Sequence, residues 1–321
     1  MAVTLSDQAR VEEYQHDAPG PAPIGAGTLG SRAARRLSAI LAALLAAGSA
    51  AGLFVDGLYR EPPSVAAMYR GYDLIALAII APALGVMLLP TLRRSHRAAL
   101  LWMGLLAYSV YHSAIYVFGT RFNDLFLVHV AVFSLSVFAL GLGLANLDTG
   151  QIARAFSERT PVRAIGGILL FLAAVLAAFW SSPALRFVFT DELPREGSEL
   201  VVPTAITHLG WVLDLSLLVP AYAIAGVLLW RRAAWGYILA TIVLIAGVLQ
   251  QIDYMSALVF QANARVPGAT GFDPVEPFIT AIYLAGGAVM LRRVQGPPHE
   301  PVRTLSTLDR STRQGRVPRH P

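Results

Sequence analysis

The polar side chains that could do chemistry in this chain lie within long apolar segments. The carboxyl groups of Asp73, Asp214 and Asp253 and the imidazoles of His112 and His129 interrupt runs of Leu, Ala, Val and Ile. A charged group at the centre of a membrane helix costs about 2.5–3.5 kcal/mol on insertion scales, so such groups are expected to face one another or water. These five residues are therefore the first candidates for a binding site.

Helical spacing predicts which polar residues share a face. Gln250, Asp253 and Tyr254 are spaced i, i+3 and i+4 and form a polar stripe on one helix. Tyr111 and His112 lie together near the end of another apolar run. We predict one outward-facing polar cluster that binds a small polar or ionic solute. Its members are Asp214, Asp253, His112, Gln250, Tyr254, Tyr111, His129 and Asp73.

Three interpretations of this cluster stay open. In a transport site, the aspartates would exchange protons and His112 would relay them. In a metal site, His112, His129 and His208 would bind a zinc ion together with an aspartate, although no closely spaced histidine pair supports this. In the third interpretation, the polar groups only bind the helices to one another. The sequence predicts no cofactor.

Composition places these residues in a membrane protein. Of 321 residues, 55% are hydrophobic and 14% are charged, whereas soluble domains carry roughly 25% charged residues. A single soluble globule and a disordered chain are therefore excluded. The chain contains no Lys and no Cys, which excludes Schiff-base chemistry, disulfides and thiolate metal sites.

The apolar runs predict an all-α, polytopic membrane bundle of about eight transmembrane helices. Crossing a bilayer core takes about 20 apolar residues in a helix. Runs of that length lie near residues 37–56, 72–91, 98–119, 125–146, 164–185, 209–230, 235–260 and 275–291.

Arginine placement predicts the orientation of these spans. The segments that alternate along the chain differ strongly in their arginine content, and the arginine-rich set contains both ends of the sequence. By the positive-inside rule, both termini are cytoplasmic and the protein lies in the plasma (inner) membrane. The formal charge of +5 is then explained by the bilayer, so no nucleic-acid partner is predicted.

The spans divide into two similar groups of four. Pro82 and Pro220 each precede an arginine pair by eleven positions, in the second and sixth predicted spans. We expect two tandem four-helix units in parallel orientation, covering 37–146 and 164–292. A cytoplasmic linker at 147–163 joins them, and disordered cytoplasmic segments cover 1–36 and 293–321.

The function that the sequence favours is a transporter or channel for a small polar or ionic solute. The alternatives are a membrane-embedded enzyme with an outward-facing acid–base or metal site and an accessory or sensory subunit without a site of its own. An enzyme is less favoured because the chain has no Walker A or GxSxG motif. Small residues such as Gly286 and Gly287 would allow a homo-oligomer or a partner membrane subunit to approach closely.

Overall fold

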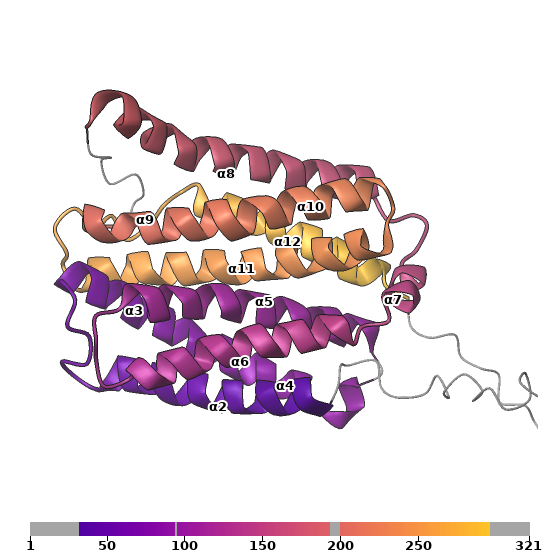
Figure 1. Cartoon of the computed structure of the whole chain (residues 1–321), viewed down its shortest axis with the longest axis horizontal. Coiled ribbons are helices and arrows are strands. Elements are labelled where there is room, and N and C mark those ends of the chain that lie inside the picture. The colour runs from indigo at the N-terminus through magenta and orange to yellow at the C-terminus, as the bar shows by residue number, and fades with distance from the viewer. Residues whose placement is uncertain (1–31, 94, 193–199, 296–321) are drawn as a thin grey trace, which may run out of the picture.

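The predicted all-α membrane bundle is confirmed by the computed structural model of the chain (Figure 1). The structure describes residues 32–93, 95–192 and 200–295, apart from the side chains of 204–208. These residues form helices and no strand, and seven of the helices are long and apolar enough to cross a membrane. Most of the two terminal segments predicted to be disordered lies outside the described residues.

The first half of the chain contains four spans. In order, these are α2 (Arg32–Phe54), a broken span made of α3 (Pro63–Ile75), the π-helical turn η1 (Ala76–Ile80) and α4 (Ala81–Met87), then α5 (His96–Gly119) and α6 (Phe126–Ala145).

The second half begins after a short helix, α7 (Thr149–Ala155). It contains α8 (Val162–Thr190), a broken span made of α9 (Thr204–Leu213), the π-helical turn η3 (Asp214–Leu218) and α10 (Val219–Trp230), then α11 (Ala234–Asn263) and α12 (Glu276–Arg293).

Three predicted spans differ from the helices observed. The second span begins at Pro63 rather than at 72, because residues of its first turns are buried in protein and need not be uniformly apolar. The fifth continues through Pro183 to Thr190. The eighth forms α12, which is not among the seven apolar spans because three of its 18 residues are charged.

Helix α11 occupies the middle of the bundle and packs against α3, α5, α10 and α12 (Figure 1). Around it, α2 packs against α6, and α8 packs along α10. The connections α2–α3, α5–α6 and α11–α12, together with the end of α8 and the start of α9, lie toward one end, here called the distal end. The opposite end, here called the terminal end, carries Arg32 and α7. Helices α2, α6 and α8 expose much of their apolar surface, as expected for helices that face lipid.

Both broken spans have the same local irregularity. In each, a π-helical turn ends two residues before a proline, Pro82 in one and Pro220 in the other. Proline has no backbone N–H, so it cannot satisfy the carbonyl four residues earlier. The amide of Ala81 instead bonds to Ala76 O, and that of Val219 bonds to Asp214 O. The five-residue spacing of these bonds marks a widened turn at the same position in each span.

Close contact between α3 and α11 holds the two halves together at their distal end. A Cβ atom added at Gly71 would lie 2.6 Å from the Cα atom of Ala257. The hydroxyl of Ser256 donates a hydrogen bond of 2.8 Å to the carbonyl of Gly71 across the same contact. The absence of a side chain at position 71 is therefore what allows the two helices to meet.

The Gly71→Ala substitution should loosen this contact. The new methyl group would meet the backbone of α11, which cannot rotate away, and overpacking of this kind costs about 1–3 kcal/mol. Thermal unfolding in detergent should show a lower midpoint. The matched control is Gly141→Ala, because a Cβ atom there meets nothing within 4 Å. Equal midpoints for both variants would show that α3 and α11 do not meet as closely as described.

Candidate functional site

A cavity of about 510 Å³ lies in the distal half of the bundle and is here called the large cavity. Its walls come from α3, α5, α8, α11, α12 and the broken span α9–α10. Five of the eight residues predicted to form a binding site line it: Tyr111, Asp214, Gln250, Asp253 and Tyr254. The fold therefore brings together polar side chains from α5, from the broken span α9–α10 and from α11, which are distant from one another along the chain.

Asp214 is the first residue of the π-helical turn η3, and two donors hold its carboxylate. The hydroxyl of Tyr111 donates to Oδ1 at 2.7 Å, and the indole N–H of Trp180 donates to Oδ2 at 2.8 Å. The donors belong to α5 and α8, so this one carboxylate joins three elements. Asp214 is only 7% exposed, and a carboxylate at that depth needs such partners.

Only one of the two carboxylate oxygens of Asp253 has a hydrogen-bond partner among the described residues. Its Oδ2 atom lies 3.1 Å from Nδ1 of His112, and the same nitrogen lies 3.1 Å from the hydroxyl of Tyr108. The Oδ1 atom is buried and has no hydrogen-bond partner among the described residues. Leaving a buried polar atom unpaired costs about 1–3 kcal/mol, and more when it is charged. Two side chains that line the large cavity therefore carry a buried atom without a hydrogen-bond partner, namely Oδ1 of Asp253 and the hydroxyl oxygen of Tyr69.

Aromatic rings make up much of the large cavity's wall. Trp180 and Trp211 stack with ring centroids 5.1 Å apart, next to the Asp214 carboxylate. Two further lining residues are joined by a hydrogen bond, in which the hydroxyl of Tyr283 donates to that of Tyr222 at 3.0 Å. The lining thus combines flat apolar surfaces with a few polar groups, as is usual in sites for small organic molecules.

Two further acids lie toward the distal end of the large cavity. Asp273 precedes α12, and Glu276 begins it. The amide of Gln251 on α11 donates a hydrogen bond to the Glu276 carboxylate. The described residues that line the large cavity include four acids and neither Arg nor His.

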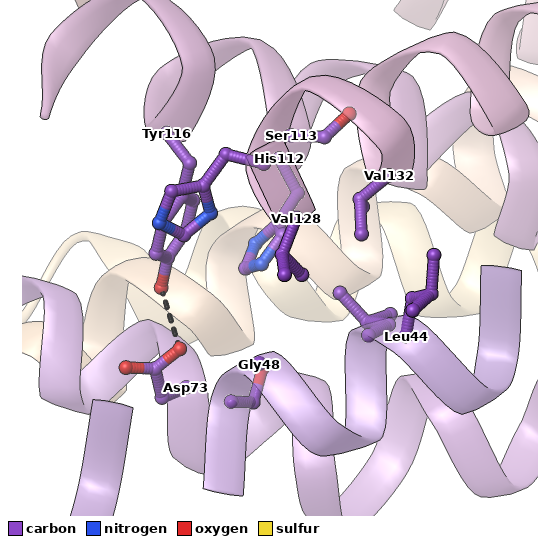
Figure 2. Close-up of a pocket in the computed structure, with 11 residues that line it drawn as sticks. Leu44, Gly48, Asp73, His112, Ser113, Tyr116, Val128 and Val132 are labelled. Atoms are coloured by element: carbon purple, nitrogen blue, oxygen red, sulfur yellow. Dashed lines mark hydrogen bonds between the residues drawn. The ribbon is translucent and has the colours of Figure 1, made fainter. Parts of the chain in front are cut away.

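A second cavity, of about 20 Å³ and here called the small cavity, lies within the first half (Figure 2). Asp73, His112, Tyr116 and His129 line it, together with apolar residues of α2 and α6. A space of this size holds about one water molecule. The Nε2 atom of His129 is buried and has no hydrogen-bond partner among the described residues, so a polar occupant would have a partner there.

Asp73 is satisfied by two tyrosines. The hydroxyl of Tyr116 donates to Oδ1 at 3.0 Å, as Figure 2 shows, and the hydroxyl of Tyr59 donates to Oδ2. Tyr59 lies in the connection between α2 and α3. Burial and then the charge of Asp73 raise the pKa of Tyr59 above its ordinary value, so its hydroxyl stays protonated and remains a donor.

The structure separates the eight predicted residues into two groups. His112, His129 and Asp73 line the small cavity and not the large one, so the eight residues are divided between two cavities. His112 lines the small cavity and hydrogen-bonds to Asp253 in the wall of the large one. It is therefore the residue that connects the two polar sites.

The alternative of a metal site depends on His112, His129 and His208. The side chain of His208 lies outside the described residues. The rings of His112 and His129 both pack against Tyr116, at centroid distances of 4.9 and 5.1 Å. Within the described part of the chain, no group of three or more His, Asp or Glu side chains is arranged to hold a metal ion.

Sequence reasoning missed several residues of the large cavity. Trp180 and Trp211 fall where aromatic side chains mark a membrane interface, and nothing in the sequence indicates that Trp180 donates to Asp214. Tyr222 and Tyr283 carry no spacing signal that links them. Gln251 is adjacent to the Gln250–Tyr254 stripe, but its partner Glu276 lies on another helix.

The fold and the cavities define a multi-pass helical membrane protein with a polar cavity inside its bundle. Neither a protein-family model, nor a curated protein, nor a solved structure matches this chain.

The large cavity should admit water, and introduced cysteines can test this because the chain has none of its own. We expect Ile115→Cys, which lies in the cavity wall, to react rapidly with a charged methanethiosulfonate reagent. The neighbouring Ala114→Cys is the matched control, since Ala114 is 2% exposed and lines neither cavity. Equal protection of both cysteines in the folded protein would show that the large cavity is closed to water.

Proposed function

We propose that this protein is a transporter or channel for a small polar or ionic solute that binds in the large cavity. The single observation that supports this most strongly is the Asp253 carboxylate, which lies in a cavity wall within a membrane-spanning helix and has one oxygen without a partner. Ionisable groups inside membrane helices commonly mark solute pathways.

The broken spans support transport in particular. Interrupted helices at corresponding positions in two halves are typical of transporter binding sites. Here the π-helical turns of both spans have the same register relative to Pro82 and Pro220, and Asp214 opens the second turn. A widened turn weakens the local helix and provides a position at which the two segments of a span can move relative to each other.

We propose further that the two halves are tandem repeats that differ in how closely their outer helices pack. In the first half, the outer helices α2 and α6 pack directly against each other. Their counterparts in the second half, α8 and α12, instead both contribute residues to the wall of the large cavity. The cavity then occupies the space that helix packing fills in the first half.

The orientation that suits this function places the distal end outside the cell and both termini in the cytoplasm. The described arginines are concentrated at the terminal end, at the beginning of α2, around α7 and at the end of α12. This distribution favours the positive-inside arrangement in a plasma membrane. The large cavity would then receive its solute from outside the cell.

Removing the charge of Asp253 should abolish transport. We expect Asp253→Asn to lose the uptake that wild-type proteoliposomes show for one member of a panel of small amines, alkali cations and uncharged polar solutes. The amide keeps the shape of the side chain but cannot provide a carboxylate. Tracer uptake would be measured alongside thermal unfolding, to separate loss of function from loss of fold.

The control for this experiment is Asp191→Asn, because Asp191 is exposed and lies outside both cavities. It should transport at the wild-type rate. Wild-type uptake by both Asp214→Asn and Asp253→Asn, or no uptake by the wild-type protein above that of empty vesicles, would overturn the proposed function.

Cysteine labelling in intact cells tests the orientation. The Phe122→Cys variant should react with a membrane-impermeant maleimide added outside the cell, because position 122 lies at the distal end and Phe122 is 74% exposed there. Arg159→Cys, an exposed position beside α7, should react only after the membrane is permeabilised. The reverse pattern would place the large cavity on the cytoplasmic side.

A further inference from the structure

We propose that the ligand of the large cavity is an organic monocation with an aromatic or apolar body, such as a substituted ammonium. This inference rests on the proposed function, because it assigns a substrate class to the same site. It depends on the charge, surface and size of the large cavity, which are three independent features.

The charge of the large cavity favours a cation. Asp214 and Asp253 lie deep in the bundle, and Asp273 and Glu276 lie nearer its distal end. The described residues that line the large cavity include no arginine or histidine, and His112, which hydrogen-bonds to Asp253 from outside this lining, can balance at most one of the four acids. The donors that hold Asp214 are a phenol and an indole, which share hydrogen bonds but carry no positive charge. A cationic ligand would supply the missing charge.

The Asp253 carboxylate gives that charge a defined partner. Asp253 is 4% exposed, and its Oδ2 atom is already hydrogen-bonded to His112. The Asp253 side chain lines the large cavity while its Oδ1 atom is buried, so a ligand in the cavity would interact with the charge of the carboxylate group. A buried carboxylate needs a counter-charge or a donor, and a bound ammonium group would provide the counter-charge, together with a donor where it carries N–H bonds.

The surface of the large cavity favours an organic cation over a bare metal ion. Nine of its described lining residues are aromatic, including the stacked pair Trp180 and Trp211. Aromatic faces attract ammonium groups through cation–π interactions, and sites for quaternary ammonium ligands are typically built this way. Inorganic cations such as Mg²⁺ and Ca²⁺ prefer several oxygen ligands at once, whereas this lining presents mainly apolar side chains.

The size of the large cavity fits the same class of ligand. Its volume of about 510 Å³ lies within the range of roughly 300–1,000 Å³ found for pockets that bind small organic molecules. A single alkali ion would leave most of this space empty. The apolar groups of α8 and α9, among them Phe179 and Leu209, would instead contact the body of an organic ligand.

Equilibrium binding to the purified, full-length protein tests this assignment. The probe is radiolabelled phenyltrimethylammonium, and the matched control ligand is tert-butylbenzene, which has nearly the same shape and no charge. We expect saturable binding of the cation and at least about tenfold weaker binding of the uncharged compound, because a buried contact with a charged group is worth a factor of this size. Quenching of tryptophan fluorescence gives a second readout, since Trp180 and Trp211 lie in the cavity wall.

Variants then locate the bound charge. Asp253→Asn should weaken cation binding at least about tenfold and leave binding of the uncharged compound unchanged. Glu276→Gln, at the distal end of the large cavity, keeps a hydrogen-bonding group beside Gln251 and provides a second test that does not depend on the folding of the first variant. It should weaken cation binding by a smaller factor. Asp191→Asn, outside the cavity, should bind as the wild-type protein does.

Two results would overturn the assignment. One is equally tight binding of the charged and uncharged compounds by the wild-type protein, and the other is no saturable binding of the cation at millimolar concentration. Either result would leave the proposed function standing if proteoliposomes took up an uncharged or anionic solute in an Asp253-dependent manner. Conversely, cation binding without any flux in proteoliposomes would preserve the ligand assignment and overturn transport.

Discussion

The structure depends on one constraint, which is that carboxyl groups inside a membrane bundle must find their partners within the protein. Asp73 and Asp214 each accept hydrogen bonds from two side-chain donors on separate elements, so each carboxylate fixes the relative positions of those elements. Helix α5 provides a donor to both, through Tyr116 and Tyr111. Asp253 differs, because only one of its oxygens is paired within the protein. Asp214 and Asp253 line the large cavity, whereas Asp73 does not, and this position is what makes the first two candidates for binding a ligand.

The two broken spans provide positions at which the bundle can change shape near these carboxyl groups. Each span has a π-helical turn just before a proline, and in the second span the turn begins at Asp214. The helix is therefore weakest where a polar side chain faces the large cavity. The distal part of the first broken span is held against α11 at Gly71, whereas Leu209 and Gly210 of the second line the large cavity. A difference of this kind between similar halves would allow one half to serve as a rigid support while the other changes shape.

Much of the fold could be predicted from the sequence, since a lipid environment imposes length and hydropathy on each span. Pro82 and Pro220 indicated where two helices are irregular, although proline alone does not specify a π-helical turn. The start of α3 at Pro63 could not be predicted from hydropathy because its first turns contact protein rather than lipid.

The candidate site could be predicted only in part. Helical spacing identified Gln250, Asp253 and Tyr254 as one face, and all three line the large cavity. Spacing says nothing about the rotation of one helix against another. The sequence therefore could not reveal that His112 faces the small cavity or that Trp180 reaches Asp214.

The most direct measurement is a structure in lipid with bound 4-bromophenyl-trimethylammonium, located by the anomalous scattering of bromine. We predict a single strong bromine peak inside the large cavity, beside the apolar residues Phe179 and Leu209, with the ammonium end of the molecule directed toward Asp253. A peak elsewhere in the bundle, or an empty cavity at a saturating concentration, would contradict the assignment of this cavity as the binding site.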